Sequence, residues 1–367
     1  MALLWALSWL AAAQALEVGD LFGNHSGQVS FWTDPCRQHG SCRLCMAAGC
    51  AWQQQAQHCT SAKSLLAEAA GAPQEMCLPE EKVTNFSVDE AHRMARYSYA
   101  AYYDQPAGYL SKNAEVVKTF FYTIGAWDRA FGFLAVDRAE KLITLAFRGS
   151  ETLTQVFVEV LRHTLVPFRG DKQVLVNQFF VHAAEDLLPE ITPVLQMQMK
   201  SCKSCQLRVT GHSLGAAMAM LVAYNISFWS PEPPVLYTFG QPRTCNFAFA
   251  QMAEQRLVLY RVVNGADPVP HLPLCTRQSW LSTSSPCKNV TNGYYHAGTE
   301  IWFPSGDYEG NVMCHYRECV RPPRSEDMSC SDGLTWPRSA VVMDHHRYWD
   351  VLPRGFCNHQ EVFELVV

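Results

Sequence analysis

The chain has 367 residues, of which 48% are hydrophobic and 17% charged, so it can bury a large core and has a globular composition. The net charge is −5 and no basic run is present, which argues against nucleic acid as a partner. An apolar run over residues 2–13, followed by Ala15 at an A-x-A site, predicts a signal peptide over residues 1–15. The run is short for a membrane anchor, which is the alternative, and no later stretch reaches transmembrane length. We therefore expect a secreted chain with no transmembrane segment after cleavage.

Fifteen cysteines and four Asn-x-Ser/Thr sequons also indicate an oxidising compartment. The odd number of cysteines leaves at least one thiol unpaired in a monomer. The expected glycosylation sites are Asn24, Asn85, Asn225 and Asn289. Asn225 would be blocked if it lay on a packed helix.

Six of the cysteines fall within residues 36–77, in a segment with too few aliphatic residues for a core of its own. We expect residues 16–80 to form a small module held by disulfides rather than by zinc, because only His39 and His58 are nearby. The spacing C-x5-C-x2-C-x4-C with a Gly-Cys-x-Trp sequence resembles the plexin–semaphorin–integrin cysteine-rich domain. The cysteine that usually follows the tryptophan of that domain is absent.

A second domain is expected over residues 81–367. Ser87 and Glu90 form a capping box at the start of its first helix. The expected helices comprise residues 91–103, 176–199, 214–224 and 247–255. The expected strands comprise residues 118–124, 130–136, 141–147, 206–210, 234–240, 257–263 and 300–303. This alternation predicts an α/β fold with a mostly parallel, doubly wound sheet.

The sequence Gly211-His212-Ser213-Leu214-Gly215 matches the pattern G-x-S-x-G between a predicted strand and an apolar helix. This is the context of a nucleophile elbow, in which a sharp turn lifts the serine hydroxyl above the sheet. The two glycines would relieve the crowding that side chains would cause there. Ser213 is therefore the candidate nucleophile, and the alternative is a surface serine in a tight turn.

A serine hydroxyl needs a base to remove its proton and an acid to orient that base, and on such a sheet the acid and then the histidine follow the serine. Asp267 is the best candidate acid because it directly follows an apolar strand, with Asp307 and Asp344 as alternatives. The candidate bases are His271, His296, His345 and His346. Reach along the chain does not decide among them.

Several motifs of the second domain occur in the order found in fungal-type, or class 3, lipases, which the sequence resembles over residues 85–352. The matching motifs are Phe147-Arg148-Gly149-Ser150, Val181-His182, Val209-Thr210-Gly211-His212-Ser213-Leu214-Gly215, Thr238-Phe239-Gly240-Gln241-Pro242-Arg243, Asn264 with Asp267-Pro268-Val269-Pro270, and Asp344-His345-x-x-Tyr348-Trp349. The resemblance implies an α/β-hydrolase fold and a catalytic triad of Ser213, Asp267 and His345.

The oxyanion of the reaction intermediate needs backbone N–H donors. The residue after the nucleophile, Leu214, supplies one, and the resemblance implies Ser150 as the second. We expect no cofactor and no metal site, because the histidines lack an H-E-x-x-H or i, i+4 pattern. The C-x-x-C pair Cys202 and Cys205 lacks the context of a redox motif and is expected in structural disulfides.

A helical stripe of apolar residues follows Ser150 within residues 151–161. Its members are Leu153, Val156, Phe157, Val160 and Leu161. Class 3 lipases carry their lid at this position, so the resemblance implies a segment that covers the site and binds substrate at a lipid interface. The alternative is an ordinary helix facing the core.

Together these features predict a secreted serine hydrolase that cleaves lipid esters through an acyl-serine intermediate, of the triacylglycerol lipase or phospholipase A1 type. Its expected partner is a lipid ester at an interface. Two alternatives stay open: a feruloyl-type or other small-ester esterase, and a non-catalytic surface-binding protein on the same fold. A partner for the N-terminal module does not follow from the sequence.

Overall fold

The structure is a computed structural model, and it describes residues 51–53, 58–60, 84–124, 128–149, 164–276, 287–304, 316–319, 324–334 and 342–348. The predicted signal peptide, most of the cysteine-rich module, and Ser150 with the stripe after it lie outside the described residues. Within residues 16–80, for which the sequence predicts a module, β1 (Ala51–Gln53) and β2 (His58–Thr60) pair in antiparallel fashion.

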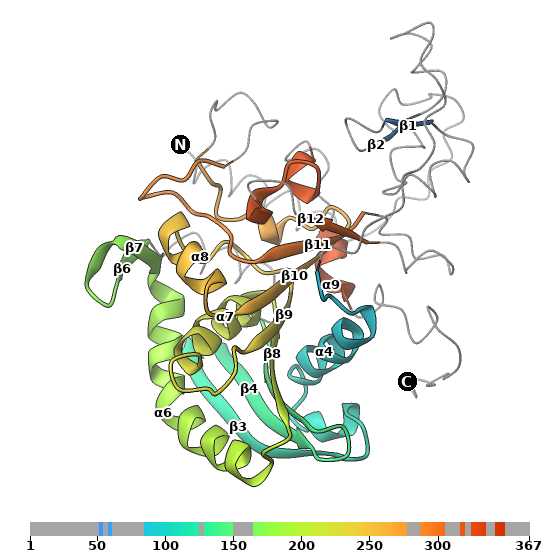
Figure 1. Ribbon diagram of the computed structural model, residues 1–367, viewed down its shortest axis with the longest axis vertical. Helices are drawn as coiled ribbons and strands as arrows, with labels where there is room; N and C mark the ends of the chain where they lie inside the picture. The colour runs from blue at the N-terminus through green and yellow to red at the C-terminus, as the bar shows by residue number, and fades with distance from the viewer. Residues whose placement is uncertain are drawn as a thin grey trace, which may run out of the picture.

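Within the described residues, a central sheet of eight strands has the order β12-β11-β10-β9-β8-β5-β4-β3 (Figure 1). Its strands are β3 (Ala114–Ile124), β4 (Asp128–Asp137), β5 (Leu142–Phe147), β8 (Gln206–His212), β9 (Val235–Phe239), β10 (Val258–Asn264), β11 (Thr299–Phe303) and β12 (Arg317–Cys319). Strands β5, β8, β9, β10 and β11 are parallel, whereas β3 and β4 at one edge and β12 at the other pair in antiparallel fashion. The prediction of a mostly parallel sheet is confirmed.

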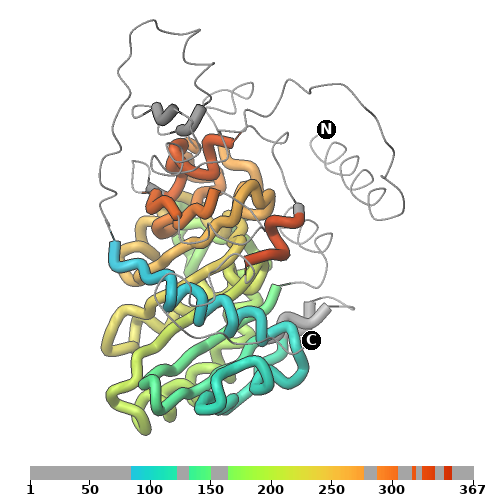
Figure 2. Tube along the Cα trace, turned by 90° about the vertical axis from the view of Figure 1, so that its right-hand side faces the viewer, coloured from blue at the N-terminus to red at the C-terminus, as the bar shows by residue number. Residues whose placement is uncertain are grey.

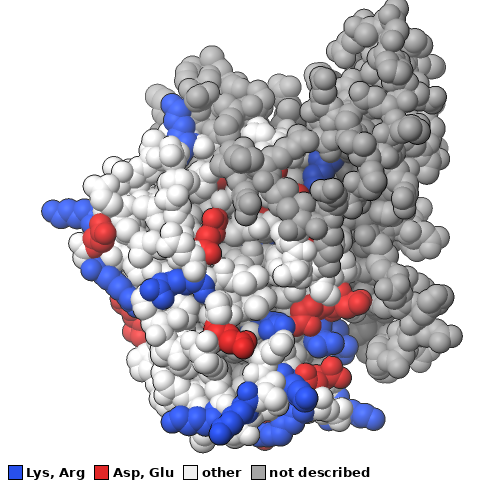
Figure 3. All heavy atoms as spheres, viewed as in Figure 1, with Lys and Arg blue, Asp and Glu red and all other residues white. Residues whose placement is uncertain are grey.

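Helices cover both faces of this sheet. They are α4 (Val88–Ala100), α6 (Gln178–Ser201), α7 (Leu214–Ile226), α8 (Phe247–Glu254) and α9 (Val342–His346). Helices α6, α7 and α8 pack on one face, and α4 packs on the other, where Figure 2 shows it in blue crossing the sheet. A hydrophobic core lies on each face of the sheet, and strand β4 contributes side chains to both. Leu134 and Val136 point to one face, while Phe133 and Ala135 point to the other. On the face that Figure 3 presents, basic side chains are interspersed with acidic ones.

The start of α4 follows from the predicted cap, but earlier than expected. Ser87 accepts a hydrogen bond from the backbone N–H of Glu90 at 3.3 Å, and the helix begins at Val88 rather than at residue 91. The Glu90 carboxylate binds the Nε of Arg208 on β8 at 2.8 Å, which ties α4 to the neighbouring strand.

A hairpin of β6 (Leu165–Phe168) and β7 (Asp171–Asn177) was not predicted from the sequence. The expected helix over residues 176–199 begins at Gln178 instead, because Asn177 caps it by accepting from the N–H of Phe179 at 3.0 Å. The two-residue turn Arg169-Gly170 has positive φ angles of 51° and 84°. The sequence Asn-Gly would have predicted this conformation, whereas Arg-Gly is a weaker signal for it.

Disulfides join cysteines close in sequence. The described pairs are Cys202–Cys205, Cys275–Cys287 and Cys319–Cys330. The first confirms the expectation of a structural disulfide at the C-x-x-C sequence. Cys245 is unpaired and buried, and burial raises the pKa of its thiol. Among the described helices, none combines the length and the apolar character needed to cross a membrane.

Candidate active site

Ser213 lies in the sharp turn between β8 and α7. Its backbone has a positive φ of 58°, and its N–H donates to the carbonyl of Phe239 on β9 at 2.9 Å. A Cβ added at Gly211 would overlap the backbone of Gly215, and one added at Gly215 would overlap the carbonyl of Arg148. The strained turn is therefore possible only because both flanking positions are glycine.

Asp267 and His345 meet beside this turn, although they are 78 residues apart in sequence. The Nδ1 atom of His345 lies 2.9 Å from one carboxylate oxygen of Asp267 and 3.1 Å from the other. Both side chains are buried. Asp267 also accepts from the N–H of Val269 at 2.8 Å and from the hydroxyl of Tyr348. Burial and the Asp267 carboxylate raise the pKa of Tyr348 well above its ordinary value, so its hydroxyl stays a donor.

A glycine makes room for this pair. Gly240 follows β9 with a φ of 59°, in the left-handed region. A Cβ at this position would lie 2.8 Å from Cε1 of His345 and 2.9 Å from an oxygen of Asp267. The acid and the histidine thus pack directly against bare backbone, which explains why a glycine is needed at this point of the Thr238–Arg243 motif.

Two atoms of the candidate triad have no hydrogen-bond partner among the described residues. They are the hydroxyl oxygen of Ser213 and the Nε2 atom of His345, and both are buried. Because a carboxylate can only accept, Asp267 selects the tautomer in which Nδ1 of His345 carries the proton. Nε2 then keeps its lone pair and can accept a proton.

A directional chain of hydrogen bonds runs behind these residues. The Nε2 atom of His212 lies 2.8 Å from the backbone carbonyl of His345, and its Nδ1 lies 2.7 Å from the hydroxyl of Tyr102. Since a carbonyl oxygen only accepts, Nε2 of His212 is the donor and Nδ1 accepts from Tyr102. The Tyr102 oxygen in turn accepts from the N–H of Gly149 at 3.0 Å. This chain links the end of β5 to the backbone of His345.

His212 must be neutral to accept a hydrogen bond at Nδ1 while it donates one from Nε2. Its ring is buried, and burial together with the nearby His345 lowers the pKa of His212 well below its ordinary value. In the sequence, His212 stands out only as a member of the elbow motif. Tyr102, 110 residues away on the turn after α4, carried no local signal at all.

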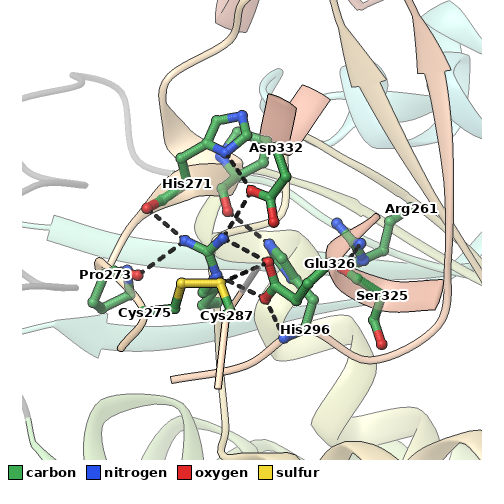
Figure 4. The surroundings of a disulfide bond; sticks show 11 residues. Arg261, His271, Pro273, Cys275, Cys287, His296, Ser325, Glu326 and Asp332 are labelled. Atoms are coloured by element: carbon green, nitrogen blue, oxygen red, sulfur yellow. Dashed lines mark hydrogen bonds and ion pairs between the residues drawn. A yellow bond between two sulfur atoms is a disulfide. The ribbon is translucent and has the colours of Figure 1, made fainter. Parts of the chain in front are cut away.

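A buried cluster of charges supports the loop that carries Asp267 (Figure 4). Arg243, in the motif after β9, binds both carboxylate oxygens of Glu326 at 2.8 and 2.7 Å and one oxygen of Asp332 at 3.0 Å. Its Nη1 donates to the backbone carbonyl of His271 at 2.7 Å. Arg243 therefore fixes the segment that follows the candidate acid.

The two carboxyl groups of this cluster titrate differently. Burial raises the pKa of Glu326 to about 8, although Arg243 opposes the shift. Burial also acts to raise the pKa of Asp332, but Arg243 and His271 outweigh it and hold that pKa well below its usual range. The disulfide Cys275–Cys287 lies against Glu326, and its sulfurs, being bonded to each other, offer no thiolate to a metal ion.

Of the four candidate histidines, His345 is the one that meets Asp267. His271 contacts a carboxylate of the buried charge cluster at 3.0 Å. His296 donates from Nε2 to a loop carbonyl at 2.6 Å and is held neutral, since burial lowers its pKa well below the ordinary value. The side chain of His346 is exposed.

The two alternative acids are Asp344 and Asp307. The Asp344 carboxylate accepts from the N–H of Ala266 at 2.8 Å and so supports the turn before Asp267. Asp307 lies outside the described residues, as do Ser150 and the apolar stripe that follows it. Leu214 is the first residue of α7, where backbone N–H groups have no partner within the helix.

The predicted glycosylation sites differ in exposure. Asn85 and Asn289 are exposed, and Asn24 lies outside the described residues. Asn225 is half-buried in the last turn of α7, where its oxygen accepts from Arg169 at 2.6 Å and its nitrogen donates to a backbone carbonyl at 2.9 Å. Its amide is engaged at both ends in the folded chain.

The parallel sheet, the elbow after β8 and the candidate Ser–His–Asp arrangement define the class as a serine hydrolase with the α/β-hydrolase fold. Residues 144–277 match the family model described as lipase (class 3). A lipase of Caenorhabditis elegans is 33% identical over 255 residues, which cover 64% of this chain and 70% of that protein. The chain belongs to the class 3 lipase family and is a carboxylic ester hydrolase.

Fungal proteins give a second group of similarities. A lipase of Rhizomucor miehei is 30% identical over 229 residues, covering 60% of this chain and 54% of that protein, so the match spans about half the length of this fungal relative. Among solved structures, lipase II of Rhizopus niveus has a TM-score of 0.58 at 24% identity, over 72% of this chain and 94% of that chain. The triacylglyceride lipase of Rhizomucor miehei has a TM-score of 0.59 at 24% identity, over 75% of this chain and 98% of that chain. These structures share the fold.

Proposed function

We propose that the protein hydrolyses lipid esters, with Ser213 as nucleophile, His345 as base and Asp267 as the group that orients the base. One observation carries this proposal. The Nδ1 atom of His345 is fixed by the buried Asp267 at 2.9 Å, while its Nε2 atom and the Ser213 hydroxyl are both buried and have no other partner among the described residues. A buried polar atom without a partner is costly unless a ligand or a reaction uses it.

The chemistry proceeds in two halves. Nε2 of His345 takes the hydroxyl proton of Ser213 as the oxygen attacks the ester carbonyl, and it then gives this proton to the leaving alcohol. The acyl group stays bonded to Ser213. Water next attacks the acyl-serine with His345 again as base, which releases the carboxylic acid and restores the serine. Asp267 holds the ring and stabilises its positive charge after each proton transfer.

The oxyanion is assigned to the backbone N–H groups of Leu214 and Ser150. Leu214 opens α7, so its N–H is free of the helix and lies at the positive end of the helix dipole. Support for Ser150 comes from its neighbour, because the backbone of Gly149 packs so closely on the elbow that a Cβ there would lie 2.6 Å from the Cβ of Ser213. Two donors in such a place stabilise the negative oxygen of the intermediate.

Acylglycerols are the substrates we favour, with phospholipids cleaved in the manner of phospholipase A1 as the second possibility. The relatives include secreted mono- and diacylglycerol lipases of Fusarium solani and Penicillium cyclopium, each 28% identical in the matched region. The same names support secretion as the location. A screen with a triglyceride, a phospholipid and a feruloyl ester tests this choice, with Ser213→Ala as the blank. Preference for the feruloyl ester would replace lipids by small esters as the substrate class.

The stripe of Leu153, Val156, Phe157, Val160 and Leu161 is proposed as a lid that turns outward at a lipid surface. Each large apolar side chain moved from water into lipid contributes about 1.5–3 kcal/mol, so a few are enough to shift a closed-to-open equilibrium. Phe157→Asp should slow the hydrolysis of aggregated lipid more than that of a short soluble ester, and Phe157→Leu should change neither. Equal losses on both substrates, or no rate increase at the aggregation threshold, would mean an open site.

A further inference from the structure

A hollow of about 340 Å³ lies where the β6–β7 hairpin meets the carboxyl end of α7 and the end of α8. Phe168, Val174 and Tyr224 line it and are buried, so its inner wall is apolar and aromatic. Tyr224 lies 11 residues beyond Ser213 along α7, which corresponds to about 16 Å of helix. The hollow is therefore separate from the candidate active site.

Two arginines share one aromatic ring at the mouth of the hollow. The guanidinium carbon of Arg256 lies 4.0 Å from the centre of the Phe228 ring, and that of Arg169 lies 4.7 Å from it. Both arginines are exposed, and Phe228 is 46% exposed. Asp171 also lines the hollow, but among the described residues neither it nor any other carboxylate forms an ion pair with either arginine. The ring offsets part of the repulsion between the two cations, and a bound anion would offset more of it.

The backbone at Arg169 adds an independent observation. Its φ of 51° is in the left-handed region, where a residue with a side chain of this size is strained by about 1–2 kcal/mol. Asparagine or glycine usually occupies this position of a two-residue hairpin turn. The strain places the guanidinium over Phe228 and within 2.6 Å of the Asn225 oxygen. The turn requires a positive φ at this position, but it does not require an arginine there, and strained residues with side chains often occur at functional sites.

We propose that this hollow binds an amphiphilic anion, whose carboxylate or phosphate lies between Arg169 and Arg256 and whose apolar chain packs against Tyr224 and Phe168. Guanidinium groups suit both kinds of anion, because they donate two parallel hydrogen bonds to paired oxygens. A volume of about 340 Å³ is at the small end of ligand pockets. The hollow therefore holds the head group and the first part of the chain, and the rest extends into solvent. This inference does not depend on the proposed catalytic residues.

Photochemical labelling of the full-length protein tests the proposal. The probes are a fatty acid and an alkyl phosphate that each carry a diazirine next to the anionic group. Labelled peptides, identified by mass spectrometry, are expected to contain Tyr224, Phe228 or Met252. Laurate and dodecyl phosphate should each compete with the label, and comparison of the two shows which head group is preferred. Dodecanol, which has the same chain without a charge, should not compete.

Variants separate this site from general charge attraction. Arg256→Gln removes an exposed side chain and should lower labelling of these peptides by about tenfold, the loss of one charge-assisted contact. Lys172→Gln removes the same charge from the same hairpin without lining the hollow, and it should leave labelling unchanged. Arg169→Asn, which suits the positive φ, should lower labelling while the protein stays as stable as the wild type or becomes more stable.

Four results would overturn the proposal. Equal losses in Arg256→Gln and Lys172→Gln would mean attraction by net charge alone, and competition by dodecanol would mean apolar adsorption. Full competition by inorganic phosphate at the same concentration would mean a site for a free anion rather than for an amphiphile. Label that appears only after removal of a glycan from Asn225 would mean that the hollow holds the sugar.

Discussion

Tyr102→Phe tests the hydrogen-bond chain behind the active site. The substitution keeps the ring and removes one hydroxyl, which donates to Nδ1 of His212 and accepts from the N–H of Gly149. Both of these partners are buried, and each loses its hydrogen bond to the Tyr102 hydroxyl. The far end of the chain is the backbone carbonyl of His345. We therefore expect an effect on catalysis as well as on stability.

The size of the effect follows from these two lost bonds. A buried polar group left without a partner costs about 1–3 kcal/mol. Tyr102 is only half-buried, so water can enter and replace part of the loss. We expect the free energy of unfolding to fall by about 2 kcal/mol. If the transition state is destabilised by the same ~2 kcal/mol, kcat falls by about thirtyfold, because each ~1.4 kcal/mol of activation free energy changes kcat tenfold.

The assay combines urea unfolding with the kinetics of a short, soluble ester, which avoids effects of an interface. Tyr99→Phe is the matched control, since Tyr99 lies three residues earlier, in the last turn of α4, and its hydroxyl contacts that of Tyr103. The control should change kcat by less than about twofold, because the hydroxyl that it removes contacts Tyr103 rather than His212 or Gly149. A normal kcat in Tyr102→Phe with reduced stability would show that the chain supports the fold alone.

Three further predictions concern titrating groups. His345→Ala should abolish esterase activity and His346→Ala should retain most of it, and a dead His346→Ala variant would shift the assignment of the base by one residue. Burial lowers the pKa of His212 and His296 well below the ordinary value, so the unfolded chain binds protons that the folded chain does not. Urea unfolding should therefore show that the free energy of unfolding falls as the pH drops below about 6.5. A free energy of unfolding that stays constant below this pH would contradict the burial argument. Burial raises the pKa of Glu326 to about 8, so the folded chain keeps this proton between about pH 4.5 and 8 while the unfolded chain loses it. The free energy of unfolding of the wild type should therefore fall relative to that of Glu326→Gln as the pH rises over that range. Parallel curves for the two proteins would show that Glu326 is ionised throughout.

The sheet and the elbow could be predicted from the sequence because their signals are local. Apolar runs mark the parallel strands, and G-x-S-x-G marks the turn at Ser213. The hairpin β6–β7 could not be predicted, because its strands are short and its turn uses Arg169 where Asn is usual. Helix α6 was placed two residues too early for the same reason, since Val176 belongs to the hairpin.

The supporting residues of the site depend on contacts between distant parts of the chain. The sequence singled out Arg243 only as part of a motif, and its role in holding the loop after Asp267 required the positions of Glu326 and Asp332. Likewise, Tyr102 reaches His212 across 110 residues of sequence. No periodicity or spacing rule carries such information, whereas the fold brings these groups together directly.

The central claim is that Ser213 is activated by His345 as the nucleophile of an ester hydrolase. The most direct test is labelling with a fluorophosphonate, which reacts only with an activated serine, followed by identification of the modified peptide and a parallel esterase assay. We predict label on Ser213 alone, loss of activity in proportion to labelling, and no label in Ser213→Ala or His345→Ala. Label on another serine, or full activity of a protein completely labelled at Ser213, would contradict the account.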